Sequence, residues 1–104
     1  MRFTRKIHST ALLALALGLA SAAQAQVKVG VVSSATGPTA LVGIPQKNTV
    51  PLLPKTVGGL TVEYIPLDDA SDPTNSVTAV RKLIAENNVD AIIGPSGSPN
   101  AKIG

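Results

Sequence analysis

Few side chains of this sequence could do covalent or metal chemistry. The whole chain has no cysteine and one histidine, His8, which lies in a segment that we expect to be cleaved off. Histidine and cysteine supply the usual ligands of transition metals and take part in most acid–base and nucleophilic sites. The sequence therefore predicts no catalytic residue, no metal site and no cofactor, and it argues against an enzyme.

Two adjacent carboxylates, Asp68 and Asp69, are the remaining candidates for acid–base chemistry. They follow a predicted edge strand, and the side chains of neighbouring residues in extended backbone point in opposite directions. Such a pair does not converge on one proton. We therefore interpret Asp68 and Asp69 as residues of a solvated loop.

Small polar loops point to a different chemistry, the binding of a small ligand. The segments Ser33–Thr39 (SSATGPT) and Pro95–Asn100 (PSGSPN) are rich in Ser, Thr and Gly and contain no charge. In the second segment, Ser98 is placed to cap a helix that begins at Pro99. The amide hydrogens and positive dipole end of such a helix, with the hydroxyls of Ser96 and Ser98, could hold a carboxylate or another compact anion.

A purely structural role is an alternative for both segments. Ser98 could do no more than cap its own helix, and the residues alone leave this alternative as good as ligand binding. For Ser33, Ser34 and Thr36, a plain loop is the better interpretation of the sequence.

The elements that must position these loops alternate between strand and helix. Apolar, β-branched runs predict strands, and a helical apolar period after Asp72 and Pro73 predicts a capped helix. The other helix is interrupted, because Pro51 removes a hydrogen bond and Pro54 ends it. The predicted elements are strand Val27–Val32, helix Leu41–Val57, strand Leu60–Leu67, a helix from Pro73 toward Asn87, and strand Val89–Gly94.

This alternation favours an α/β fold with an open parallel sheet and helical crossovers. The first and third strands are largely apolar, as buried parallel strands are, whereas the second alternates and contains Pro66, as an edge strand does. The predicted spatial order is therefore 2-1-3, with one helix on each face of a three-layer structure. The two polar loops then meet at a switch point, where such sheets bind ligands.

The amino terminus has the three parts of an export signal: a cationic start, an apolar run and a small-x-small cleavage site. The apolar run is about half as long as the 20 or so residues that a membrane-spanning helix needs. We expect cleavage after Ala25 and export to the periplasm. The three parts are Arg2, Arg5 and Lys6, then Ala11–Ala20, then Ala23-Gln24-Ala25.

Removal of residues 1–25 changes the charge of the protein. The full chain has a net charge of +3, but residues 26–104 contain six Lys and Arg against six Asp and Glu. This balance gives no reason to expect nucleic acid as a partner. The 79 residues that remain can build only a small core and stop where a helix would begin, so we expect an incomplete domain.

Three segments resemble the branched-chain amino acid (leucine/isoleucine/valine) binding proteins of ABC importers, which are type I periplasmic binding proteins. The resemblance covers nearly all of residues 26–104 and keeps the order and spacing of that family. It rests on Val27–Val32 followed by Thr36-Gly37-Pro38, on Asp68–Pro73 (DDASDP), and on Val89–Gly94 followed by Ser96-Gly97-Ser98.

The resemblance implies the first part of lobe 1 of a two-lobed, monomeric, periplasmic protein. Such proteins close on an amino acid or an amino-acid-like small molecule and deliver it to an ABC permease in the inner membrane. The serine that matches Ser98 holds the ligand's head group, and the residues that match Ser96 and Gly97 line the same pocket. Val42 matches a position where some relatives place an aromatic ring, so branched-chain specificity does not follow.

In that family, the opposite lobe supplies an acidic partner for the ammonium group of the ligand. Residues 26–104 alone are therefore expected to bind ligand weakly or not at all. The resemblance does not identify the ligand.

Three other interpretations compete with this one. A nucleotide-binding enzyme domain would need Gly-x-Gly-x-x-Gly after the first strand, and the spacing from Gly30 to Gly37 does not provide it. The ligand-binding domain of a sensory receptor would share the fold and the loop, and would continue into a transmembrane helix. A truncated product without function is compatible with the same family.

Overall fold

The strand β1 (Gln26–Ser33) lies inside a four-stranded sheet in the computed structural model of the chain. The structure describes residues 26–102, so the predicted export signal and cleavage site in residues 1–25 lie outside the described residues. β1 pairs in parallel with β3 (Leu60–Asp68) on one side and with β4 (Ala91–Ile93) on the other. The predicted order 2-1-3 of the three parallel strands is therefore confirmed.

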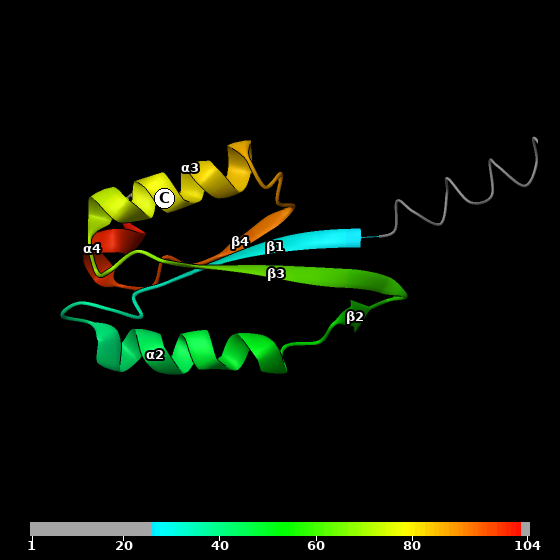
Figure 1. Cartoon of the computed structure of the whole chain (residues 1–104), viewed down its shortest axis with the longest axis horizontal. Helices are drawn as coiled ribbons and strands as arrows, with labels where there is room; N and C mark the ends of the chain where they lie inside the picture. The colour runs from blue at the N-terminus through cyan, green and yellow to red at the C-terminus, as the bar shows by residue number, and fades with distance from the viewer. Residues whose placement is uncertain (1–25, 103–104) are drawn as a thin grey trace, which may run out of the picture.

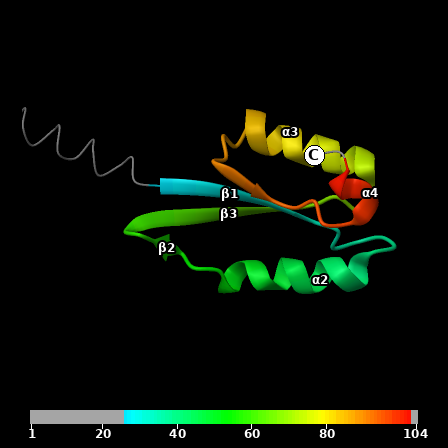
Figure 2. The same ribbon diagram turned by 180° about the vertical axis from the view of Figure 1, so that it is seen from behind.

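The helices cover opposite faces of the sheet, as right-handed crossovers require. Figure 1 shows α3 (Pro73–Ala85) and the short helix α4 (Ser98–Ala101) on one face, and α2 (Ala40–Thr49) on the other. The view from behind in Figure 2 shows the same layers and places α4 beside one end of α3. The predicted three-layer α/β arrangement is confirmed.

The first helix is shorter than predicted. The sequence predicts one interrupted helix over Leu41–Val57, whereas α2 ends at Thr49 and a 3-10 turn, η1 (Val50–Leu52), follows it. Pro51 explains this end, because it lacks the amide hydrogen that a further α-helical turn would use. The prediction is therefore wrong for the second half of the segment.

The last residues of the predicted helix form a strand instead. Thr56–Val57 is β2, which pairs antiparallel with β3 and extends the sheet order to β2-β3-β1-β4. Gly58 and Gly59 make the predicted turn between these strands, with φ of 57° and 80°, values that glycine adopts without steric cost. β2 thus covers the predicted edge strand β3 at Leu60 and Thr61, and the amide of Val62 also donates to the carbonyl oxygen of Lys55 at 2.8 Å.

Asp72 begins α3 as predicted. Its carboxylate accepts hydrogen bonds from the backbone amides of Thr74 (2.7 Å) and Asn75 (3.4 Å), and Pro73 occupies the first helical position. These contacts fix the start of the helix directly after the loop that leaves β3. The position of α3 over the sheet is therefore set from its first turn.

A small apolar core lies between α3 and the sheet. Leu83 is fully buried and packs with Ala79 against Val32 of β1, and Ile92 of β4 is partly buried beside them. The opposite side has less apolar packing, since the one buried residue of α2 is Gly43. Leu83 is therefore the central apolar contact of the described residues.

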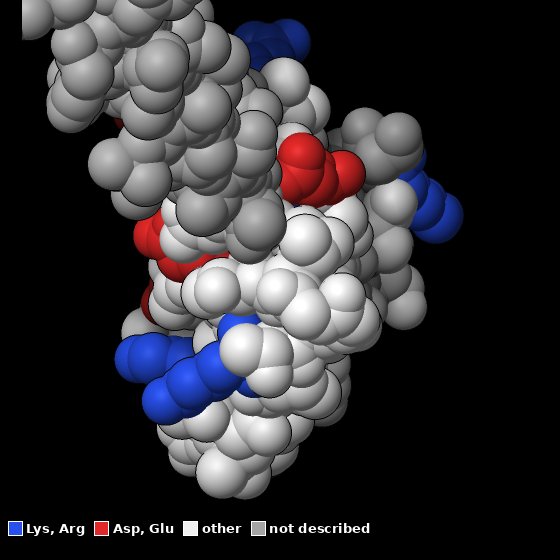
Figure 3. Space-filling model, turned by 90° about the vertical axis from the view of Figure 1, so that its right-hand side faces the viewer, with Lys and Arg blue, Asp and Glu red and all other residues white. Residues whose placement is uncertain are grey.

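Charged side chains are scattered over the face of the molecule that Figure 3 shows. Figure 3 looks onto the end of the molecule where β1 begins and shows Lys, Arg, Asp and Glu side chains scattered with uncharged surface between them. Among the described residues, no helix has both the length and the apolar character that crossing a bilayer requires.

We expect Leu83→Ala to lower the free energy of unfolding by about 2–5 kcal/mol, the usual cost of emptying a buried leucine site. Ile84→Ala is the matched control, because Ile84 is the next residue of α3 and is 58% exposed. Its cost should stay below about 1 kcal/mol. Urea unfolding followed by circular dichroism measures both, and equal losses would contradict the packing of α3 on the sheet.

Candidate ligand-binding cleft

An uncharged cleft of about 270 Å³ opens at the carboxyl ends of β1 and β4. Its walls are the loop after β1, the first turn of α2 and the loop after β4. All four residues that the sequence suggests for ligand binding line it, and three more complete the lining. The four are Val42, Ser96, Gly97 and Ser98, and the other three are Ser34, Thr39 and Gly43.

Gly43 sets how closely α2 approaches the loop after β1. A β-carbon built on Gly43 would lie 1.8 Å from the carbonyl oxygen of Ser34, so only glycine fits between the helix and the loop. This contact brings Val42, the residue before it, to the mouth of the cleft. Val42 is 61% exposed there.

The helix α4 begins one residue earlier than predicted. Gly97 is the residue before the first helical turn, because its carbonyl oxygen accepts the first helical hydrogen bond, from the amide of Ala101 at 2.7 Å. Ser98 is thus the first helical residue, and no side chain caps the helix. The predicted capping role of Ser98 is wrong, which leaves its exposed hydroxyl uncommitted to the helix end.

Ser96 connects the loop after β4 to α2. Its hydroxyl donates a hydrogen bond of 2.7 Å to the side-chain oxygen of Gln46. The sequence analysis did not single out Gln46, although it lies one helical turn after Val42 and so on the same face of α2. The four-residue spacing from Val42 is the sequence signal that could have identified Gln46.

A second hollow of about 270 Å³ adjoins the cleft between α2 and the sheet. Ser96 lines both hollows and therefore lies at their junction. The second hollow is lined mainly by aliphatic side chains, among them Val31, Val50 and Ile93. Such a lining suits apolar packing and offers little to orient a polar head group.

Asp69 lies below the cleft and is not the solvated loop residue that the sequence suggests. It has no exposed surface. One carboxylate oxygen accepts from the hydroxyl of Ser34 (2.7 Å) and the amide of Ser71 (3.0 Å). The other accepts from the hydroxyl of Ser76 (2.6 Å) and the side-chain amide of Asn100 (2.7 Å). The prediction failed because these donors come from segments that only the fold brings together.

The hydrogen bonds of Asp69 decide its ionisation. Burial by itself raises the pKa of this carboxyl group, but the bonds from Ser76, Ser34, Asn100 and the amide of Ser71 together outweigh burial. The pKa of Asp69 is therefore held below its ordinary value of 3.8. At neutral pH, Asp69 is a fully paired, buried carboxylate.

Asp68 holds the loop after β1 from the outside. Its side chain is exposed, as predicted, and accepts from the amides of Ala35 (2.9 Å) and Ala70 (2.9 Å) and from the hydroxyl of Thr36 (2.7 Å). Partial burial raises the pKa of Asp68, and the bonds from Thr36, Ala70 and Ala35 more than offset this and lower it. The two adjacent carboxylates thus point to different partners and form no acid–base pair.

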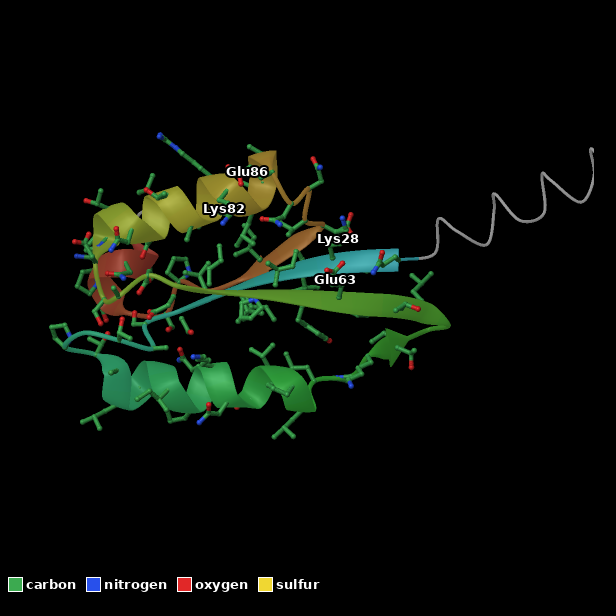
Figure 4. The ribbon with its side chains drawn as sticks, viewed as in Figure 1. Lys28, Glu63, Lys82 and Glu86 are labelled. Atoms are coloured by element: carbon green, nitrogen blue, oxygen red, sulfur yellow. The ribbon has the colours of Figure 1, made fainter. Side chains whose placement is uncertain are left out.

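Other charged side chains keep away from the cleft. Figure 4 shows Lys28 and Glu63 on neighbouring strands toward their amino ends, Lys82 in the last turn of α3, and Glu86 directly after that helix. No Lys, Arg, Asp or Glu is among the described residues that line the cleft. A charged ligand group would therefore be met by hydroxyls and backbone amides.

Within residues 26–102, no cluster of three His, Cys, Asp or Glu side chains could hold a metal ion.

Comparison with protein families finds one matching model, described as a periplasmic binding protein, over residues 26–103. A comparison with curated protein sequences finds no match.

Solved structures give a consistent result. An extracellular ligand-binding receptor from Rhodopseudomonas palustris HaA2 is 51% identical, with 68% of this chain and 20% of that chain covered and a TM-score of 0.67. A solute binding protein of an ABC transporter from Rhodopseudomonas palustris BisB5, in complex with 3,4-dihydroxy benzoic acid, is 31% identical, with 74% and 22% covered and a TM-score of 0.68. A leucine binding protein from Thermotoga maritima is 30% identical, with 71% and 22% covered and a TM-score of 0.61. The chain thus spans about a fifth of the length of these structures.

We expect Gly43→Ala to lower the free energy of unfolding by about 1–3 kcal/mol, since the added methyl group overlaps the backbone of Ser34. Val42→Ala is the control, because Val42 is the preceding residue and is exposed. It should change the free energy of unfolding by no more than about 0.5 kcal/mol. Urea unfolding measures both variants. A Gly43→Ala variant as stable as the control would show that α2 does not touch the loop after β1.

Acid should unfold the protein partly through Asp69. Its pKa is lower in the folded chain than the ordinary 3.8, so the unfolded chain binds more protons in that range. The stabilisation is present above pH 3.8 and is lost as the pH falls through the folded pKa. Asp69→Asn should therefore be less stable at neutral pH and show a flatter loss of stability on acidification. Urea unfolding at a series of pH values tests this, and an unchanged pH slope would contradict it.

Proposed function

Because this chain belongs to the periplasmic binding protein family, we propose that it forms the first part of lobe 1 of the solute-binding component of an ABC importer. In this proposal the protein is exported, cleaved after Ala25 and active in the periplasm as a monomer. It captures a small molecule and delivers it to a permease in the inner membrane. The observation that carries the proposal is the uncharged cleft in which Val42, Ser96, Gly97 and Ser98 come together.

The proposed ligand is an amino acid or an amino-acid-like carboxylic acid. Hydroxyls and backbone amides at the start of a helix suit a carboxylate, because they donate hydrogen bonds without the desolvation cost of a buried cation. Two of the relatives support an acid, since one is a leucine binding protein and the other was solved with 3,4-dihydroxy benzoic acid. Their ligands differ in side group and share the carboxyl group.

The hydrogen bonds already present in the cleft suggest a role for each side chain. Ser98 has an exposed hydroxyl that is not engaged in capping, so it is the proposed donor to the carboxylate. The hydroxyl of Ser96 donates its one hydrogen bond to Gln46. Toward a ligand, the Ser96 oxygen can therefore only accept a hydrogen bond, as from an ammonium or hydroxyl group. Gly97 leaves space between them because it has no side chain.

The small side chain of Val42 affects how wide a ligand the cleft can hold. It is small, exposed and placed at the mouth of the cleft, so it leaves room for a ring or a branched side chain. We therefore propose a range of acids that includes aromatic ones as well as branched-chain amino acids.

A chimera tests this function, because the chain spans only about a fifth of the structures it matches. Residues 26–102 replace the matching segment of the Rhodopseudomonas palustris HaA2 receptor, and thermal unfolding is followed with leucine, isoleucine or 3,4-dihydroxybenzoate. At least one acid should stabilise the chimera, by about 2.7 kcal/mol at a hundred times its Kd. The 104-residue chain alone should show little or no shift. A chimera that folds and responds to none of these acids would contradict the proposed ligand class.

Ser98→Ala in the chimera should weaken binding of the stabilising acid by roughly 10- to 100-fold, as expected for loss of a hydrogen bond to a charged group. Thr78→Ala is the control, because Thr78 is an exposed hydroxyl residue of α3 that does not line the cleft. It should leave the affinity unchanged. Titration calorimetry compares the two variants, and equal affinities would remove Ser98 from the site.

A further inference from the structure

The two walls of the cleft share one buried support. Ser34 belongs to the wall after β1, and Ser96, Gly97 and Ser98 form the wall after β4. Asp69, which lines neither wall, bonds to Ser34 of the first wall and to Asn100, which follows the second wall by two residues. We propose that Asp69 is a positioning residue that fixes the loop of Gly97 and Ser98 relative to Ser34; its relevance to binding rests on the function proposed above.

The connection to the second wall passes through Asn100. Asn100 is the buried residue of α4 and is 2% exposed, and its side-chain amide donates to Asp69 at 2.7 Å. α4 is four residues long and has too few hydrogen bonds of its own to hold a position. The bond between Asn100 and Asp69 is therefore the polar anchor of this short helix, whose first residue is Ser98.

Gly97 packs next to the Asn100 side chain and the Ser34 hydroxyl. A β-carbon built on Gly97 would be 3.8 Å from the Asn100 side chain and 3.8 Å from the hydroxyl oxygen of Ser34. These are ordinary packing distances, so the loop that contains Gly97 packs against Asn100 and Ser34. Because Asp69 bonds to both of these side chains, a displacement of Asp69 would move both Ser34 and Asn100.

Only a carboxylate satisfies the donors around position 69. All four partners of Asp69 donate, and both of its oxygens are used twice. An asparagine there would present an amide hydrogen to two donors, in a place that water does not reach, since Asp69 has no exposed surface. A serine hydroxyl can rotate to accept instead, but the amide of Asn100 would have to turn over. The change therefore acts mainly on α4.

A special backbone turn holds Asp69 in place. Ala70 and Ser71, which follow it, both have left-handed backbone, with φ of 53° and 63°, uncommon for residues with a side chain. The amide of Ser71 bonds to the Asp69 carboxylate, and the Ser71 hydroxyl donates to the carbonyl oxygen of Thr36. The turn thus ties the position of Asp69 to the loop after β1.

The test uses nuclear magnetic resonance of the full chain without ligand, so its result does not depend on the ligand proposal. The reporters are the amide shifts of Gly97 and Ser98 and the exchange rate of the Ala101 amide, which closes the first turn of α4. In Asp69→Asn, the amide of Leu83 in α3 should exchange faster only by the factor that the loss of global stability gives, while Ala101 should be accelerated at least about tenfold more than Leu83. An equal acceleration of both amides would mean that Asp69 only stabilises the fold, and would overturn the proposal.

An exchange of the two partners provides the rescue. Asn100→Asp alone places two carboxylates against each other and should also release α4. The double variant Asp69→Asn with Asn100→Asp restores one carboxylate and one amide, and should return the Ala101 rate and the Gly97 shift toward wild type. A double variant in which Ala101 exchanges as fast as in the two single variants would overturn the proposal, because the bond to Asn100 would then not be what positions the loop.

Asp68→Asn is the matched control, because Asp68 is the neighbouring carboxylate and bonds only to the loop after β1 and to Ala70. It should leave the Gly97 and Ser98 shifts in place. Acid titration over the pH range in which each variant stays folded adds a second readout: these shifts should move as the pH falls in wild type and in Asp68→Asn, and stay constant in Asp69→Asn. The titratable groups nearest in sequence are Asp68 and Asp72, and the contacts from the loop after β1, from α3 and from α4 are hydroxyls and an amide. Shifts that titrate equally in Asp69→Asn would overturn the proposal.

Discussion

A carboxylate without contact with water is stable in a protein only when donors replace its hydration shell. Asp69 meets this condition with four donors, which come from the loop after β1, from its own turn, from α3 and from α4. Three of them are side chains that approach only in the folded chain. The requirement therefore constrains three separate segments at once, at the end of the sheet where the cleft lies.

Parallel pairing of β1 with both β3 and β4 creates that end of the sheet. Parallel strands need crossovers, and these place the loops after each strand at one side. The loops after β1 and β4 then face each other across the point where the strand order reverses. Small residues fill this region. Gly43 lets α2 approach the loop after β1 closely enough for the helix to form one wall of the cleft.

The proposed binding cleft presents hydroxyls and backbone amides, and no charged side chain is among its described lining residues. This matters because a cation in a partly buried site would lose hydration before any ligand arrived. Ser96 and Ser98 differ in what they can offer, since Ser96 already donates to Gln46 while Ser98 has no role in the helix cap. A ligand with both an acidic and a hydrogen-bond-donating group fits this division.

The sequence by itself determined the layers and the strand order. Local signals suffice for these: apolar runs for β1 and β4, alternation with Pro66 for β3, and Asp72 with Pro73 for the start of α3. It also placed Val42, Ser96, Gly97 and Ser98 near one another through the switch point and the family resemblance.

Local signals were insufficient where the outcome depended on partners distant in the sequence. The strand β2 depended on pairing with β3, which begins only after the turn at Gly58 and Gly59. The state of Asp69 was decided entirely by tertiary structure. Adjacent in sequence to an exposed carboxylate, it is buried because Ser34, Ser76 and Asn100 converge on it in the fold, and no local pattern encodes that convergence.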